Sequence, residues 1–215
     1  MTYLQLVNKV LTRLREETVS TVSQNSYSAL VGEFVNDAKQ FVEDSWDWSA
    51  LRTTLTLTTT ADIFNYNLTG SGNRIEILDV VNDTSNFFLK YKEQHWFNNT
   101  FLNNEPAKGS PAYYTFNGVD SNGDTAVDIY PIPNGVYAIR FNSILRTPEL
   151  SEDTDQVLIP TLPIIHLATA FAARERGETG GTSAGEMFNI ADKSLSDAIA
   201  LDTSKHPEEL IYQAV

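Results

Sequence analysis

The two ends of the chain carry hydrophobic residues at helical spacing, whereas the middle carries them at strand spacing. Apolar side chains return every three or four positions between Leu4 and Leu14, which predicts an amphipathic helix. Thr2 and Gln5 stand at the start of this stripe with the spacing of a capping box, in which each side chain binds the other residue's free backbone N–H. After a polar loop, a second stripe predicts another helix at about Tyr27–Trp46.

Beyond the second helix, the hydrophobic period becomes that of a β-strand. Leu55 and Leu57 alternate with threonines, and Phe64, Tyr66 and Leu68 alternate with asparagines. Because only a short polar turn separates the two segments, we expect them to pair as a β-hairpin.

Further short apolar segments, separated by turn residues, predict a region rich in β-structure. The separators Gly70–Asn73, Asp120–Asp124 and Pro133–Gly135 have the composition of tight turns. The segments between them that read as strands are 75–81, 87–89, 113–116, 126–130 and 137–145, and residues 91–102 read as one short amphipathic helix. Short strands at this spacing are typical of a β-sandwich or a barrel-like sheet.

Helical spacing returns near the C-terminus. An apolar stripe runs from Ile164 to Ala172, and Gly177 can adopt the left-handed conformation that ends a helix. Ser183 and Glu186 form a second candidate capping box, which opens a helix that continues through about residue 199.

Each pair of terminal helices is too small to bury its apolar stripe alone. We therefore expect residues 1–48 and 160–202 to pack as one discontinuous helical bundle, with residues 49–159 inserted as an antiparallel β-sandwich or barrel-like domain. Residues 203–215 contain apolar side chains but no helical stripe, so we expect them to form a C-terminal extension. The expected fold class is α+β.

The amino-acid composition argues against several classes of function. The 15 Lys and Arg residues against 28 Asp and Glu give a net charge of −13, which argues against wrapping DNA or docking on an anionic membrane. The chain has no cysteine, so disulfides, thiolate zinc sites and cysteine nucleophiles are excluded. Apolar runs fall short of the roughly 18 residues of a membrane span, and the N-terminus shows no signal-peptide pattern.

The sequence contains no convincing catalytic or metal-binding motif. His95, His166 and His206 are far apart, and neither a serine-hydrolase elbow nor a P-loop is present. Oxygen-bearing side chains within Asp120–Asp128 partly match a calcium loop, but the glycine and the glutamate of that motif are missing, so a tight acidic turn is favoured. We expect no enzyme activity, no metal and no cofactor.

Two weaker alternatives remain open. Glu43, Asp44 and Asp47 lie next to tryptophans and could supply the paired carboxylates of a polysaccharide hydrolase. We favour a solvated helix face or salt bridges between subunits for these acids, because Glu43 and Asp47 stand four residues apart at a helix end. The second alternative is a sugar-binding module that uses the aromatic side chains of Trp96, Tyr113 and Tyr114.

Four arginines lie near the ends of predicted helices, namely Arg13, Arg15, Arg174 and Arg176. Positive charge at a helix C-terminus complements the helix dipole. The same guanidinium groups could also pair with an acidic patch on a neighbouring copy of the chain. With Glu43 and Asp47, they are our candidate subunit-interface residues.

The order of the segments TYLQLVNKVLTRLREETV, YSALVGEFVNDAKQFVEDSWDWSALRTTLTLTT and HLATAFAARERGETGG resembles that of the head-to-tail adaptors of short-tailed phages (podoviruses), also called tail tubular protein A or gatekeeper-type proteins. This resemblance covers almost the whole chain and implies a structural role in the virion, at the head–tail junction, for a protein made in the host bacterial cytoplasm. Such adaptors form a ring, usually of twelve subunits, beneath the portal.

The resemblance also implies partners. The ring docks on the portal protein, carries the tail nozzle protein (tail tubular protein B type) and continues the channel through which double-stranded DNA leaves. Carried onto this chain, the bundle helices would make subunit contacts, and Leu210, Ile211, Tyr212 and Val215 would anchor the C-terminal extension on the portal. No membrane partner is implied. Within a virion, the alternatives become a peptidoglycan hydrolase and a host-glycan-binding tail module.

Overall fold

The computed structural model describes residues 1–103, 105–177 and 184–205. These residues form five α-helices together with antiparallel and mixed sheets, so the fold is of the α+β class. The chain divides into two compact units, a helical unit of Met1–Leu51 with Thr147–Val215 and a β unit of Arg52–Arg146. The described strands form no closed barrel.

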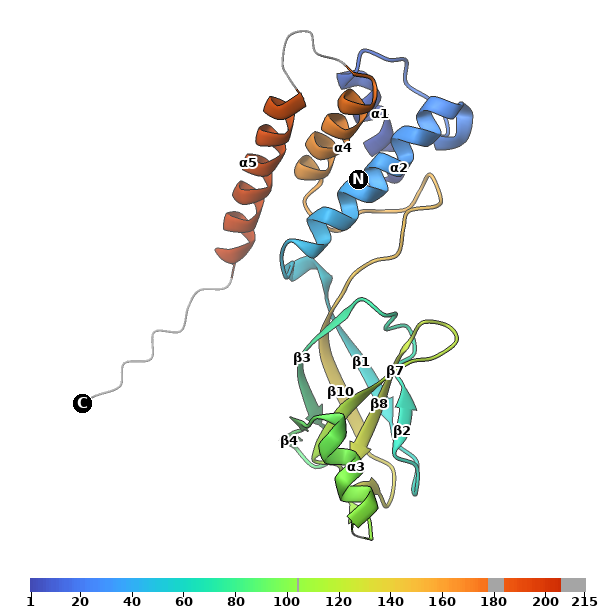
Figure 1. The fold of residues 1–215 in the computed structure, drawn as a ribbon, viewed down its shortest axis with the longest axis vertical. Coiled ribbons are helices and arrows are strands. Elements are labelled where there is room, and N and C mark those ends of the chain that lie inside the picture. Colours follow the sequence, from blue (N-terminus) through green and yellow to red (C-terminus); the bar gives the residue numbers. More distant parts are fainter. Residues whose placement is uncertain (104, 178–183, 206–215) are drawn as a thin grey trace, which may run out of the picture. The chain divides into compact units, whose positions relative to one another are not determined.

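Four helices form the helical unit: α1 (Tyr3–Arg13), α2 (Ser26–Asp44), α4 (Thr161–Glu175) and α5 (Ala184–Thr203). Helix α4 packs against each of the other three (Figure 1). Small residues make this possible, because Ala168, Ala170 and Ala172 are fully buried and let neighbouring backbones approach closely. Short 3₁₀ helices at Val22–Gln24 and Ser49–Leu51 complete the unit.

Local capping signals set the helix ends. The capping box predicted at Thr2 and Gln5 is confirmed, with Oγ1 of Thr2 3.3 Å from the backbone nitrogen of Gln5. Helix α2 begins with a second reciprocal box, between Asn25 and Ser28, which the sequence analysis did not predict. Helix α4 ends as expected, with Gly177 at φ +65°. The box predicted at Ser183 falls outside the described residues.

Helices α1 and α2 approach closely at Gly32. A β-carbon at Gly32 would collide with the hydroxyl of Tyr3 and with Val22, so any larger residue there would have to displace these side chains. The Tyr3 side chain is 4% exposed. Its burial, together with the nearby carboxylates of Glu33, Asp153 and Glu149, raises the pKa of Tyr3 to about 12. The hydroxyl therefore remains neutral at neutral pH.

Two four-stranded sheets build the β unit. The first is antiparallel with the order β1-β10-β3-β4, and its strands are β1 (Arg52–Thr58), β10 (Ala138–Leu145), β3 (Ile75–Asn82) and β4 (Phe87–Phe88). The second has the order β2-β8-β7-β5, and its strands are β2 (Asn65–Asn67), β8 (Thr125–Tyr130), β7 (Tyr113–Val119) and β5 (Lys90–Tyr91). Strands β5 and β7 are parallel, so this sheet is mixed.

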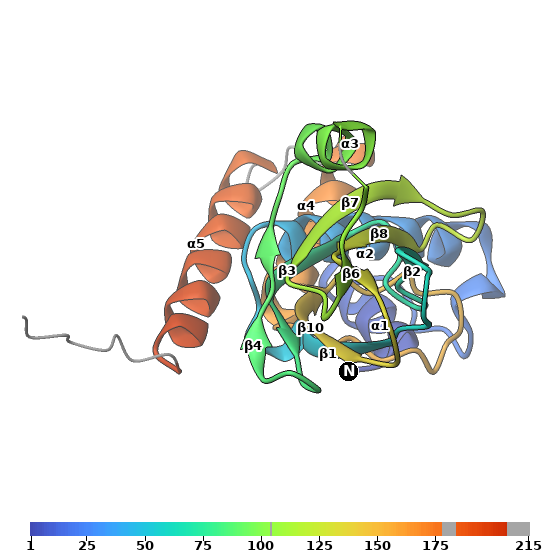
Figure 2. The same ribbon diagram turned by 90° about the horizontal axis from the view of Figure 1, so that it is seen from below.

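Smaller elements complete the unit. Strands β6 (Lys108–Gly109) and β9 (Ile132–Pro133) form a short parallel pair. Helix α3 (Gln94–Asn103) lies beside β7 (Figure 2) and confirms the short helix predicted in this region.

The predicted hairpin between residues 55–57 and 64–68 is wrong. Strand β1 pairs with β10, more than eighty positions later in the chain, whereas β2 pairs with β8 of the other sheet. The two sheets share one core, which contains Leu57, Val80, Val127 and Phe141. The alternating pattern therefore marked Leu57 and Leu68 correctly as buried, but Phe64 is exposed and neither strand has the predicted partner.

Candidate assembly surfaces

A buried ion pair on α2 holds the chain where it returns from the β unit. The ammonium of Lys39 lies 3.1 Å from a carboxylate oxygen of Glu43, and the two side chains are only 3% and 1% exposed. Lys39 also donates to the backbone carbonyls of Thr147 and Pro148, at 3.0 and 2.9 Å. The hydroxyl of Thr147 donates to Glu43 at 2.6 Å. These contacts partly offset the cost of removing both charges from water.

We call the contacts of α2 with residues 147–150 the α2 clamp. Asn36, one turn before Lys39, also belongs to it. Its amide donates to the carbonyl of Leu150 at 3.0 Å and accepts from the N–H of Leu150 at 2.9 Å. Asn36, Lys39 and Glu43 therefore form one polar stripe, at positions i, i+3 and i+7 of α2, that binds residues 147–150. The sequence analysis missed this role, although the i, i+4 spacing of Lys39 and Glu43 is visible in the sequence.

The same contacts correct the expectation for Glu43. Its carboxylate does not point into water but is committed to contacts inside the helical unit. Asp44 and Asp47 are exposed. Nearby, the indole of Trp48 is buried and donates to the carbonyl of Val42 at 2.7 Å. Glu43 is therefore not accessible as one of the two carboxylates that the polysaccharide-hydrolase alternative requires. The side chain of Trp48 is buried and is not exposed to a sugar.

The four arginines lie at the ends of α1 and α4, but their surroundings differ. Arg176 pairs with Glu16 at 3.0 Å and lies over the ring of Tyr27. Arg174 lies over two aromatic rings, those of Phe171 and Phe188, at 5.6 and 5.4 Å from their centroids. These contacts fasten the end of α4 to α5 and to the start of α2.

Arg13 and Arg15 are the other two of the four candidate interface arginines. Both side chains are exposed at the end of α1, and Arg13 lies in its last turn, where positive charge complements the helix dipole. Burial of part of the Arg13 side chain lowers its pKa, yet a guanidinium remains charged at any physiological pH.

A buried carboxylate fixes the end of α5. Asp202, in the last turn, is 4% exposed and accepts hydrogen bonds from the backbone N–H and the hydroxyl of Ser49, at 2.9 and 2.6 Å. It also pairs with Lys205 at 2.9 Å. Burial alone would raise the pKa of Asp202, but the hydrogen bonds from Ser49 and Lys205 outweigh it and lower the pKa. The start of residues 203–215 is thus tied to Ser49, three positions before the β unit begins.

The predicted C-terminal anchors, Leu210, Ile211, Tyr212 and Val215, lie outside the described residues. Their proposed contact with a portal therefore stays a prediction.

The acidic loop at Asp120–Asp124 is a tight turn held by hydrogen bonds from backbone N–H groups to its carboxylates, which we call a braced turn. One oxygen of Asp124 accepts from the backbone N–H groups of Gly70 and Gly72, each at 3.0 Å. Asp120 accepts from the N–H groups of Asn122 and Asp124. The carboxylates of Asp120 and Asp124 thus accept hydrogen bonds from backbone N–H groups of two neighbouring turns, 70–73 and 120–124. Among the described residues, no group of three or more His, Cys, Asp or Glu side chains could hold a metal ion.

We expect Asp124→Ala to lower the free energy of unfolding by about 1 to 2 kcal/mol, because two backbone N–H groups lose a charged acceptor. Urea denaturation followed by circular dichroism measures this change. Ser121→Ala, in the same turn but with an exposed side chain, should change stability by less than about 0.5 kcal/mol. Calcium should leave the melting temperature of the unmodified protein unchanged, whereas a rise with calcium would contradict the braced-turn interpretation.

Trp96, Tyr113 and Tyr114, the proposed sugar-stacking residues, each pack against aromatic side chains of the β unit. Trp96 and Tyr113 lie 5.1 Å apart between ring centroids, and the ammonium of Lys92 lies within 5.6 Å of both. Tyr114 packs against Phe141 of the core, and burial raises the pKa of its hydroxyl. These contacts are those of side chains that stabilise the β unit.

The chain belongs to the SU10 adaptor protein family, whose model matches residues 1–214. This is a family of phage head–tail adaptors, so the protein is a structural adaptor and a component of the virion. No curated protein matches the chain. Within the described part of the chain, no helix combines the length and the apolar character that crossing a membrane requires.

Proposed function

We propose that the chain is a ring-forming head-to-tail adaptor of the tail tubular A or gatekeeper type, from a short-tailed phage. The ring, usually of twelve copies in such adaptors, docks beneath the portal protein, carries the tail nozzle protein and continues the channel through which double-stranded DNA leaves. The observation that carries this proposal is the family match over residues 1–214. The acidic composition of the chain suits such a conduit, because carboxylates repel phosphates.

Each part of the chain has a role in this proposal. The helical unit makes the contacts between subunits, in which Arg13, Arg15, Asp47, Arg174 and Arg176 take part. The apolar residues of the C-terminal segment, Leu210, Ile211, Tyr212 and Val215, bind the portal. The turns at 70–73 and 120–124 of the β unit face the nozzle, and their brace at Asp124 supports this role because a docking surface needs defined loops.

Light-scattering mass on the purified protein, alone and then mixed with portal particles, tests the proposal. We expect subunits of 24.0 kDa to join the portal in a discrete multiple. A chain that ends at residue 202 should fail to join, because it lacks the apolar anchors. As a matched control, the double variant Glu208→Gln, Glu209→Gln should join the portal normally, since it changes the same segment but none of the anchors. A full-length protein that ignores the portal would overturn the proposal.

A further inference from the structure

Three arginines of the helical unit have no carboxylate partner within the described part of the chain. Arg13, Arg15 and Arg174 are exposed, and their guanidinium groups form no ion pair with another described residue. This is unexpected in a chain with 28 acidic and only 15 basic side chains. A guanidinium presents five donors and pairs readily with carboxylates, so a carboxylate of another molecule is a suitable partner for these groups.

One of these arginines lines a hollow between three helices, which we call the arginine hollow. It encloses about 240 Å³ and is lined by Arg13 of α1, His166 and Thr169 of α4, and Met187 and Ile190 of α5. Met187 and Ile190 give it an apolar wall, and Ile190 is 50% exposed. Its surface is therefore suited to an apolar group that carries a negative charge beside it.

The charge of the arginine hollow comes from Arg13. Burial and the adjacent positive charge of Arg13 lower the pKa of His166, which a hydrogen bond with the backbone of Ile190 only partly opposes. His166 is therefore neutral at neutral pH, and a carboxylate in this hollow would meet the single positive charge of Arg13.

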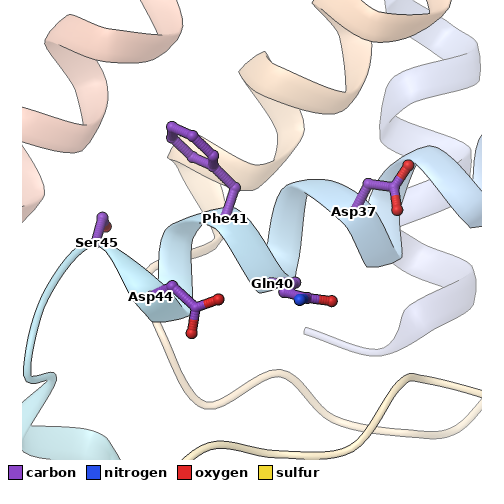
Figure 3. A pocket seen from close by; sticks show the side chains of 5 residues that line it. All are labelled: Asp37, Gln40, Phe41, Asp44 and Ser45. Carbon is purple, nitrogen blue, oxygen red and sulfur yellow. The ribbon is translucent and has the colours of Figure 1, made fainter.

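The exposed side of α2 has the complementary chemistry, and we call it the acidic face. It consists of Asp37, Gln40, Phe41, Asp44 and Ser45, which border a hollow of about 460 Å³ (Figure 3). The ring of Phe41 is 52% exposed, with Asp37 one turn before it and Asp44 one turn after it. Association with a partner is favourable if the partner covers the exposed phenylalanine ring and places a cation beside the neighbouring carboxylates.

The two surfaces share no residue and no helix, so one copy can use both at the same time. A contact between two different patches is heterologous, and its repetition produces a ring when the rotation between copies closes. We propose that a second copy of this chain occupies the arginine hollow, with its Phe41 against Met187 and Ile190 and its Asp37 beside Arg13. This inference rests on the proposed ring and specifies which two surfaces meet in it.

Charge reversal tests the pairing directly. Arg13→Glu or Asp37→Arg alone places like charges opposite each other, so we expect copies to associate with each other and on portal particles at least about tenfold more weakly. The double variant Arg13→Glu, Asp37→Arg restores opposite charges and should associate within about threefold of the unmodified protein. Sedimentation velocity over a concentration series measures the self-association, and light scattering measures the copies bound per portal.

Matched controls separate this contact from a general effect of charge. Lys90→Glu in the β unit and Asp192→Arg on α5 change the net charge by the same amounts as the two test variants, and both side chains are exposed. They should associate like the unmodified protein. Melting curves of every variant establish that each one is folded.

The outcomes distinguish this inference from the proposed function. If the unmodified protein joins the portal in a discrete multiple but both single reversals do so equally well, the pairing is wrong and the adaptor function stands. If Asp37→Arg abolishes only nozzle binding, the acidic face serves another partner and the pairing is again wrong. If the unmodified protein neither self-associates nor joins the portal, both proposals fail.

Cysteine cross-linking gives a second, independent readout, because the chain has no cysteine of its own. A mixture of Phe41→Cys and Ile190→Cys proteins, oxidised on portal particles, should yield a disulfide-linked dimer. A mixture of Asp192→Cys and Ile190→Cys proteins should yield none, since Asp192 belongs to neither surface. A dimer of equal yield in both mixtures would contradict the proposed contact.

Discussion

Lys39→Met should lower the free energy of unfolding by about 3 to 5 kcal/mol, one of the two largest effects we expect from a single substitution in this chain. The change removes the ammonium that pairs with Glu43 and binds the carbonyls of Thr147 and Pro148. The buried carboxylate of Glu43 then loses the positive charge of Lys39, and two carbonyls lose their charged donor. Urea denaturation followed by circular dichroism measures the loss.

Two further variants show whether the pair itself causes this loss. Glu43→Leu in the Lys39→Met background should recover part of the stability, because it removes a buried carboxylate that has lost the charge of Lys39. Lys9→Met, which removes an exposed ammonium on α1, should change the free energy of unfolding by less than about 0.5 kcal/mol. A loss below about 1 kcal/mol for Lys39→Met would show that the pair is not essential to the clamp.

The role of Glu43 shows where sequence analysis of this chain reached its limit. The acids near the end of α2 were expected to lie on a solvated face or at a subunit interface, and Asp44 and Asp47 are indeed exposed. Glu43 is buried because a segment more than a hundred positions later covers it. An i, i+4 pair of opposite charges is ordinarily a surface feature, so its burial cannot be inferred without knowing which segment covers it.

The elements that could be predicted are those with local causes. The first helix and its capping box, the short helix near residue 94 and the glycine stop after α4 all follow from interactions within a few residues. The box at Asn25 was missed because Ser28, rather than a glutamate or glutamine, completes it.

Strand partners are set by tertiary packing. The alternating residues of β1 show which side of the strand is buried, and Leu57 does lie in the core. The same pattern fits any partner strand that offers a complementary apolar face. The nearest such segment along the chain is 64–68, which is why a hairpin is predicted. In the fold, β1 pairs instead with β10, whose residues Ile139 and Phe141 lie in the same core.

Asp202→Asn should lower the free energy of unfolding by about 2 to 4 kcal/mol at pH 7. The carboxylate accepts two hydrogen bonds from Ser49 and pairs with Lys205, and hydrogen bonds to a buried charged group are worth more than neutral ones. An amide at this position turns one of its N–H groups toward a donor of Ser49, so at least one contact is lost. Urea denaturation at several pH values measures the difference.

The pH dependence identifies the carboxylate as the cause. Because the folded-state pKa of Asp202 lies below its ordinary value of 3.8, its contribution to stability is fully present above that pH and is lost as the pH falls through the folded-state value. The difference between Asp202→Asn and the unmodified protein should therefore be constant from pH 7 to pH 5 and should shrink below pH 3.8. Asp197→Asn, an exposed carboxylate on the same helix, should show almost no difference at any pH. A difference for Asp202→Asn that persists unchanged at the lowest pH would mean that shape, and not charge, holds the end of α5 to Ser49.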